Sequence, residues 1–173
     1  MRAHETQFKP DRTWFFTLNL ADETSSLLTR HAQFLGESAR DVEGLYPFET
    51  IATVILPNHL HMIWTLPEDD LDYDRRISYL QSGFTRRVAD SLSDADKARQ
   101  KAPMKPLWHR RYWDYKIRDL VDLERHIGYM HGNPVKHGLV SHPDKWRYST
   151  WHKFRDEGFL LWTNKPLGSA GEP

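Results

Sequence analysis

An antiparallel β-hairpin is predicted by the sequence FETIATVILPNHLHMIWTL at residues 48–66. Residues 48–56 and 59–66 are rich in β-branched and aromatic side chains, which favour strands. Only Pro57 and Asn58 separate the two runs, and a two-residue break between strands is typical of a tight hairpin turn. The hairpin therefore supplies two adjacent strands of a sheet.

The segments on either side of this hairpin alternate between strand and helix patterns. Residues 13–20 and 108–117 are dense in aromatic and β-branched residues and predict two further strands. Apolar side chains recur at helical spacing in residues 25–45, before Pro47, and again in residues 71–92. A last helix is expected over residues 120–133, with Asp119 as its N-cap and Pro134 as its stop.

The resulting order is β-α-β-β-α-β-α, and its first six elements match the ferredoxin-like βαββαβ unit. The predicted fold class is therefore α+β, an antiparallel sheet with helices on one face, followed by a C-terminal helix. Residues 91–105 are polar, contain Pro103 and predict an exposed basic loop. From about residue 139 an aromatic-rich tail is expected to pack back on the domain and to fray over residues 168–173.

Composition excludes several classes of protein. The 173 residues include 7 Trp, 7 Tyr and 8 Phe, which are enough large apolar side chains to build a hydrophobic core. They include no Cys, so disulfides and thiolate metal sites are impossible. No apolar run approaches the ~18 residues that a membrane-spanning helix needs, and the N-terminus lacks the apolar stretch of a secretory signal. A cytoplasmic protein without a membrane partner is the simplest expectation.

Opposite charges are concentrated in different parts of the chain, although 24 basic and 24 acidic residues cancel. Residues 37–74 hold nine acidic residues and one basic residue, a net charge of −8. Residues 97–118 hold eight basic and one acidic, a net of +7, and residues 136–155 hold five and one, a net of +4. This asymmetry favours a basic working face, although charged runs are equally typical of solvated surfaces.

A His-x-His pair opens the second strand of the hairpin. Side chains at i and i+2 of a strand point to the same face, so His59 and His61 project side by side, at a separation suited to one divalent cation. Two ordinary histidines are the alternative, because the chain contains ten. No third histidine has an obvious geometry for zinc.

Tyr129 and Asn133 lie four residues apart on the last predicted helix and therefore share a helix face. A phenol can act as a covalent nucleophile, and an amide oxygen is a hard ligand that would complete a His-His-Asn site. The alternative is a tyrosine ring buried in the core. His126, nearly one turn earlier, either assists the phenol as a base or is an ordinary helix-surface histidine.

Three blocks of sequence together resemble one known family. They are LPNHLHMIWTLP at residues 56–67, WHRRYWD at residues 108–114 and YMHGNPVKHG at residues 129–138. Their content and order resemble the REP-associated tyrosine transposases, members of the HUH single-tyrosine transposase and endonuclease superfamily. The resemblance runs over residues 12–154 and implies a nuclease domain at residues 12–138, with residues 139–173 as a C-terminal extension.

The resemblance implies a metal-dependent endonuclease and strand transferase that acts on single-stranded DNA. It implies that His59, His61 and Asn133 bind Mg²⁺ or Mn²⁺, and that Tyr129 attacks a phosphate to give a 5′-phosphotyrosine and a free 3′-OH. The implied substrates are repetitive extragenic palindromes (REPs), recognised as a DNA hairpin with a short single-stranded guide. A bacterial, nucleoid-associated monomer is also implied.

DNA contacts are expected from basic and aromatic residues of the second long helix, the fourth strand and the last helix. Arginine forms paired hydrogen bonds with phosphate or guanine, and aromatic rings stack on unpaired bases. The expected set is Arg86, Arg87, Trp108, Arg110, Arg111, Tyr112 and Lys136, with Trp113 as a further candidate for stacking. At least one of the three aromatic residues at positions 108, 112 and 113 is expected to pack into the sheet instead.

Two other functions stay open. One is a hairpin-binding protein that has lost cleavage, and the other is a metal-dependent hydrolase of small phosphodiesters that uses no covalent step. The intact Tyr129 and His-x-His pair argue against the first, and the basic loop together with the Tyr-to-Asn spacing argues against the second.

Overall fold

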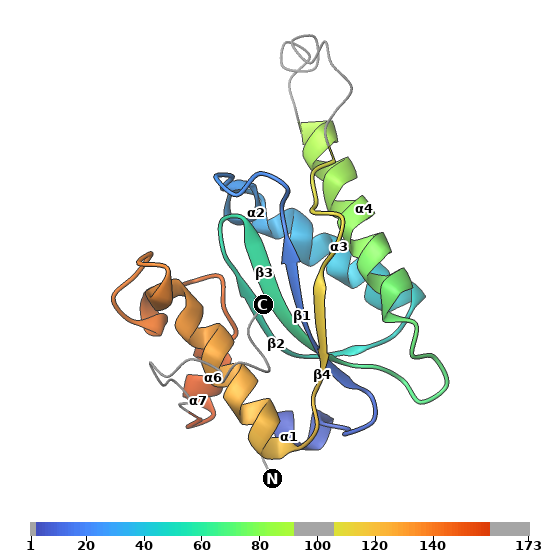
Figure 1. Ribbon diagram of the computed structural model, residues 1–173, viewed down its shortest axis with the longest axis vertical. Coiled ribbons are helices and arrows are strands. Elements are labelled where there is room, and N and C mark those ends of the chain that lie inside the picture. The colour runs from blue at the N-terminus through green and yellow to red at the C-terminus, as the bar shows by residue number, and fades with distance from the viewer. Residues whose placement is uncertain (1–2, 92–105, 160–173) are drawn as a thin grey trace.

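A four-stranded antiparallel sheet lies at the centre of the molecule (Figure 1), whose computed structural model describes residues 3–91 and 106–159. The strands follow the order β2-β3-β1-β4 across the sheet. They are β1 (Thr13–Asn19), β2 (Glu49–Ile55), β3 (His59–Thr65) and β4 (Trp113–Lys116). The predicted hairpin is β2-β3, closed by a 2.8 Å hydrogen bond from Leu56 N to His59 O. The predicted α+β class with an antiparallel sheet is confirmed.

The helices lie on both sides of this sheet. Two long helices, α3 (Ala32–Leu45) and α4 (Tyr73–Ser91), pack together on one face, and α6 (Leu120–Lys136) lies on the other (Figure 1). The shorter elements are α1 (Ala3–Gln7), α2 (Leu27–Arg30), the 3₁₀ turn η1 (Pro143–Lys145) and α7 (Trp151–Asp156). None of the helices within the described ranges is both long and apolar enough to cross a membrane.

Alternation along the strands divides the core into two layers. On β1, Phe16 and Leu18 pack with α3 and α4, whereas Phe15 packs with the α6 residues Leu123 and Ile127. All five of these side chains are fully buried. The odd-numbered positions of β1 and β3 therefore face α6, and the two histidines of β3 are among them.

Two predicted helices differ from the observed ones. Residues 25–45 form two helices, because the backbone leaves the helical conformation at His31. Leu28 N donates to Pro57 O of the hairpin turn, which ties α2 to that turn. The last helix does not stop at Asn133 but runs through Pro134 to Lys136. A proline there removes only one intrahelical donor, and the backbone bond from His137 N to Asn133 O closes the final turn.

The fourth strand is shorter than the predicted span of residues 108–117. Only Trp113–Lys116 pairs with β1, and Trp108 forms an isolated bridge with Leu20. Trp108 turns toward α4, where its Nε1 donates to Gln81 O and Thr85 Oγ1 at 3.2 Å. The aromatic density of this segment thus comes partly from a core anchor rather than from a strand.

The segment after α6 packs against the free edge of β2. Trp146 Nε1 donates to Ile55 O at 2.9 Å, and Thr150 N donates to Thr53 O at 2.9 Å. Phe154 is buried in the α6-side core. The predicted basic loop at residues 91–105 and the predicted fraying at residues 168–173 lie outside the described residues, apart from Ser91, which ends α4. The boundary at residue 138 stays a prediction.

Candidate active site

The two histidines of β3 lie side by side on the face that α6 covers. His59 pairs across the sheet with Asn19, and His61 pairs with Thr17. The two imidazole centroids are 5.2 Å apart. His61 is buried and His59 is half-buried, so one ring forms the floor of the site and the other lies nearer to solvent.

Hydrogen bonds hold Nδ1 of both rings and leave Nε2 for a ligand. His59 Nδ1 lies 2.8 Å from Asn58 Oδ1, an acceptor, so this nitrogen carries the proton and donates it. His61 Nδ1 lies 2.8 Å from Thr17 Oγ1. In the part of the chain that the structure describes, His61 Nε2 is buried without a hydrogen-bond partner. A lone pair held in this way suits a metal ligand, and hydrogen bonds that hold Nδ1 while Nε2 faces the metal are typical of metal-binding histidines.

Burial also keeps both imidazoles neutral. Removal from water and, to a smaller extent, the neighbouring His137 lower the pKa of His59 to about 4. Burial holds the pKa of His61 well below its usual range, with a smaller contribution from His59, while the side chain of Asn133 acts in the opposite direction. Because a metal binds the deprotonated ring, these residues fit a divalent cation at neutral pH.

Helix α6 brings Tyr129 to the same place. Asp119 caps the helix as predicted, with its carboxylate accepting from Asp122 N at 2.8 Å. The Tyr129 ring lies 5.7 Å from the His61 ring between centroids, and it is half-buried. One turn later, Asn133 is buried, and its Nδ2 donates to Tyr129 O at 3.0 Å. Since the amide nitrogen is engaged with the backbone, Oδ1 is the atom available as a ligand.

A third histidine also reaches the site. His137 lies one turn beyond Asn133, and its ring centroid is 5.0 Å from that of His59. The sequence signal was present, because residues 129, 133 and 137 follow a spacing of four. It was missed because the helix was expected to end before Pro134. Partial removal of the ring from water lowers the pKa of His137, and the charge of Lys136 adds to this effect.

Lys136 and His126 have different environments near Tyr129. The ammonium of Lys136 lies 5.2 Å from the centre of the Tyr129 ring, which brings a positive charge close to this tyrosine. His126 is buried, and its Nδ1 lies 2.8 Å from Asp122 O. Its ring stacks on Tyr115 with centroids 4.8 Å apart. His126 therefore belongs to the core beneath α6, so the alternative of a helix-surface histidine is wrong. Its role as a base stays a prediction.

Two of the arginines expected to bind DNA lie on the opposite side of the sheet, on α4. Arg87 forms ion pairs with two acidic residues of α3, at 3.2 Å to Glu37 and 2.6 Å to Asp41. Arg86 is exposed and lines a hollow between α3 and α4. The structure does not bring these two residues together with the histidine pair, and their contact with DNA stays a prediction.

The expected DNA-binding residues between positions 108 and 113 differ in how deeply they are buried. Trp108 is only 8% exposed and packs on Phe84, as expected for at least one of the aromatic residues. Tyr112 is half-buried, and its hydroxyl donates to the carboxylate of Asp74 on α4. Arg110 and Arg111 are exposed where the chain enters β4, and Trp113 is 40% exposed. Within residues 108–113, the solvent-facing members of the set are therefore the two arginines and Trp113.

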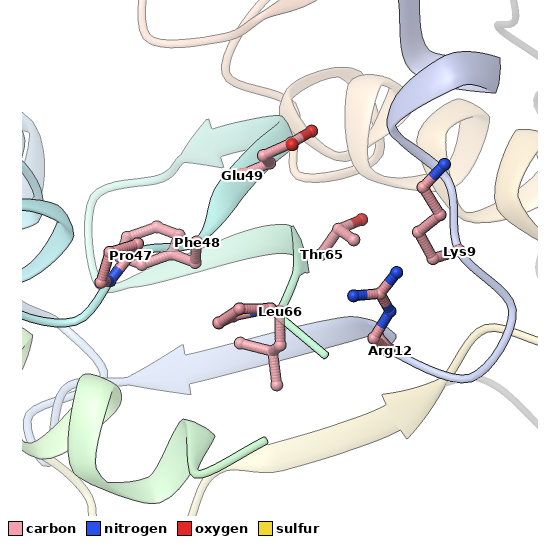
Figure 2. A pocket seen from close by; sticks show the side chains of 8 residues that line it. Lys9, Arg12, Pro47, Phe48, Glu49, Thr65 and Leu66 are labelled. Atoms are coloured by element: carbon pink, nitrogen blue, oxygen red, sulfur yellow. The ribbon is translucent and has the colours of Figure 1, made fainter. Parts of the chain in front are cut away.

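Two other features lie away from the histidine pair. A cavity of about 190 Å³ opens at the far end of β3, between Lys9, Arg12 and Thr65 (Figure 2). Ligand atoms of His4, Glu5 and Glu124 lie within 4.8 Å of one another where α1 meets α6, which gives a second group able to hold a metal ion. Neither group shares a residue with the candidate active site.

Proteins with related sequences and structures share one name. A REP-associated tyrosine transposase of Escherichia coli (strain K12) is 38% identical over 160 residues, which cover 92% of this chain and 86% of the relative. A protein of Haemophilus influenzae that provisionally bears the same name is 39% identical over 153 residues, 88% of this chain and 87% of the relative. A solved REP-associated tyrosine transposase bound to a REP hairpin matches with a TM-score of 0.80 and 35% identity, over 100% of this chain and 98% of that one.

A scan of protein-family models finds none that matches the chain. The two relatives are 39% and 38% identical to this chain, and each alignment covers at least 86% of both proteins. The hairpin-bound structure has the same fold. The chain therefore belongs to the REP-associated tyrosine transposases.

Proposed function

We propose that this protein is a metal-dependent endonuclease and strand transferase that cuts single-stranded DNA at REP hairpins through a 5′-phosphotyrosine on Tyr129. The proposal is carried by the position of the Tyr129 ring 5.7 Å from that of His61, whose buried Nε2 has no partner among the described residues. The REP hairpin bound to the related structure supports the choice of substrate.

In the proposed reaction Tyr129 Oη attacks the phosphorus atom, and the bond between phosphorus and O3′ breaks. The phenol gives up its proton to a base, the departing O3′ gains one, and the protein retains the 5′ phosphate as an ester. When the 3′-OH of another strand attacks this ester, the same steps run in reverse and the DNA is joined to a new end. The balance of bonds is unchanged, so no external energy source is needed.

A divalent cation, Mg²⁺ or Mn²⁺, held by His59, His61 and Asn133 would withdraw charge from a non-bridging phosphate oxygen. The protein's own contribution is proximity, because the nucleophile is fixed by α6 next to the sheet that holds the ligands. Lys136 adds a positive charge 5.2 Å from the Tyr129 ring, where an anionic phosphate must approach.

All of the proposed metal and catalytic residues come from a single chain. His59 and His61 lie on β3, and Tyr129 and Asn133 lie on α6 of the same domain. A second copy is not needed to complete the site, so we propose that the protein acts as a monomer. Light scattering of the protein, free and bound to a hairpin, measures this directly.

The test is to trap the covalent intermediate on a 3′-labelled REP hairpin with a single-stranded guide. The wild-type protein is expected to form a labelled adduct that resists denaturing gels. Tyr129→Phe removes one oxygen atom and should abolish the adduct and cleavage, while hairpin affinity changes little. Tyr115→Phe is the matched control, since Tyr115 lies on the same sheet face and bonds to Asp122 away from the histidine pair.

The outcomes separate the alternatives. A protein that only binds hairpins gives a complex but neither cleavage nor adduct. A hydrolase of small phosphodiesters cleaves without an adduct and keeps its activity in Tyr129→Phe. Cleavage of DNA by Tyr129→Phe at the wild-type rate would overturn the assignment of the nucleophile.

A further inference from the structure

Trp113 occupies the same row of the sheet as His61. The register pairs Thr17 of β1 with His61 on one side and with Trp113 on the other. The Cα atoms of Trp113 and of the proposed metal ligand His61 are therefore two strand spacings apart, about 10 Å. Directly paired residues of neighbouring strands share a face, so Trp113 belongs to the face that carries the active site.

The contacts of its neighbours on β4 agree with this orientation. Tyr115, two residues on, stacks against His126 of α6 with centroids 4.8 Å apart. Asp114, the next residue, points the other way and accepts a hydrogen bond from Tyr73 of α4 at 3.2 Å. Alternation along the strand then directs Trp113 toward the α6 side.

Helix α6 leaves this position uncovered because it crosses the sheet obliquely. Its first half lies over β4, where His126 contacts Tyr115. Its second half lies over β3, where Tyr129 reaches His61 and His137 reaches His59. Trp113 lies in the row of His61 but on the edge strand that the helix has already left. Its side chain is 40% exposed, and within the described ranges its indole has neither a hydrogen bond nor a ring contact.

We infer that Trp113 is the stacking platform for an unpaired base next to the phosphate that Tyr129 attacks. The inference rests on the proposed function and adds a subsite to it. An indole presents a large π-face that stacks on any base, so the subsite would position the strand rather than read its sequence. A base held on the sheet edge would direct the adjoining phosphate toward the row of His61, between the edge strand and α6. Trp108, which the sequence favoured for this role, is buried against α4 and is therefore unsuited to it.

The experiment compares Trp113→Leu, which keeps apolar bulk but has no ring, with Trp113→Phe, which keeps a ring. Tyr79→Leu is the control, because Tyr79 is a similarly exposed aromatic residue, 48%, on α4 across the sheet. Affinity is measured with a REP hairpin that carries a single-stranded guide and with the same hairpin without unpaired bases. We expect Trp113→Leu to bind the first DNA about 5- to 150-fold more weakly, the range of one lost stacking interaction. Trp113→Phe should lose only part of this, and neither Tyr79→Leu nor the fully paired hairpin should show the effect.

A second measurement does not depend on the stability of any Trp113 variant. Single 5-iodouracil bases are placed in turn along the single-stranded part of the DNA and irradiated with the Tyr129→Phe protein, which cannot form the covalent ester. Peptide mapping is expected to find the crosslink at Trp113 from a base flanking the cleavage site. Crosslinks only elsewhere, or unchanged affinity of a folded Trp113→Leu protein, would overturn the inference. Absence of the tyrosine adduct in the wild type would instead count against the proposed function.

Discussion

The hydroxyl of Thr17 lies 2.8 Å from Nδ1 of His61, in a buried hydrogen bond between the two central strands. With Nδ1 held in this way, Nε2 is the nitrogen left for a cation, and the imidazole cannot rotate without breaking the bond. Thr17 thus acts on the proposed metal site through His61, without being a ligand.

Thr17→Val removes this hydroxyl and keeps the β-branched shape of the side chain. We expect Mn²⁺ affinity and DNA cleavage to fall by about 10- to 100-fold, the usual effect of losing the hydrogen bond that orients a metal-binding histidine. Thr17→Ser should restore most of both. Thr13→Val is the control, since Thr13 lies on the same strand and face but bonds to Thr65, at the far end of the sheet. Titration calorimetry with Mn²⁺ gives the affinities, and equal losses in both valine variants would contradict a specific role for Thr17.

Asn133 and His137 are the two candidates for the third ligand of the proposed metal site. Asn133 is buried one turn from Tyr129, with its amide nitrogen bonded to Tyr129 O, whereas His137 is exposed beside His59. We expect Asn133→Ala to weaken Mn²⁺ binding at least tenfold and to abolish cleavage, and His137→Ala to reduce cleavage with a smaller effect on the metal. Calorimetry and cleavage rates measured on the same preparations decide between them. The reverse order would assign the third ligand to His137.

Most of the fold follows from local pattern. The hairpin at residues 48–66 was predictable because alternation and a two-residue turn are both local signals. The start of α6 was predictable because Asp119 is a typical N-cap residue. The break at His31 was not, since apolar spacing continues across it, and the bond that ties α2 to the distant hairpin turn, from Leu28 N to Pro57 O, is a tertiary contact. The true length of β4 depends on Trp108 packing into α4, which no local pattern reports.

In the candidate site too, some features follow from local sequence pattern and others depend on tertiary contacts. His59 and His61 could be placed together because period-two alternation is a property of the strand alone. Whether an aromatic or basic side chain is free to meet DNA depends on tertiary partners. Trp108 is buried and Arg87 is paired with Asp41, whereas Trp113 is exposed on the face of the histidine pair. His137 was not predicted as part of the site because the sequence favoured a helix end at Asn133, whereas α6 continues to Lys136.

Burial of His131 makes stability depend on pH. Burial lowers the pKa of His131 to about 3, and its Nε2 lies 3.0 Å from Thr150 Oγ1 in the tail. Between about pH 6.5 and pH 3 the unfolded chain binds a proton that the folded chain excludes, so stability falls as pH falls. For this residue alone the loss between pH 8 and pH 5 is about 2 kcal/mol.

Urea unfolding of the wild type and His131→Gln at pH 8 and pH 5 measures this contribution. The variant is expected to be less stable at pH 8 but to lose less on acidification, because one depressed histidine is absent. If the wild type and His131→Gln lose the same free energy, the proton is not excluded at His131.

The salt dependence of DNA binding tests whether Arg110 and Arg111 contact phosphates. Both are exposed beside β4, close in sequence to Trp113, and they belong to the segment that carries a net charge of +7. Each neutralised phosphate adds about −0.7 for single strands, or −0.9 for duplex, to the slope of log K against log salt. Four to six contacts on a hairpin with a single-stranded guide then give a slope of roughly −3 to −5, despite the zero net charge of the chain.

The double variant Arg110→Ala with Arg111→Ala should make that slope shallower by about one to two units if both side chains bind phosphate. If they read bases, the slope should persist and the preference for one guide sequence should decline instead. Arg30→Ala with Arg40→Ala is the control, because both of these arginines are exposed on the α2–α3 side of the molecule. The phosphates respond to the charges nearest to them, so the control should leave the slope intact even though it removes the same formal charge. An equal flattening in both double variants would mean that total charge, rather than the face beside β4, governs binding.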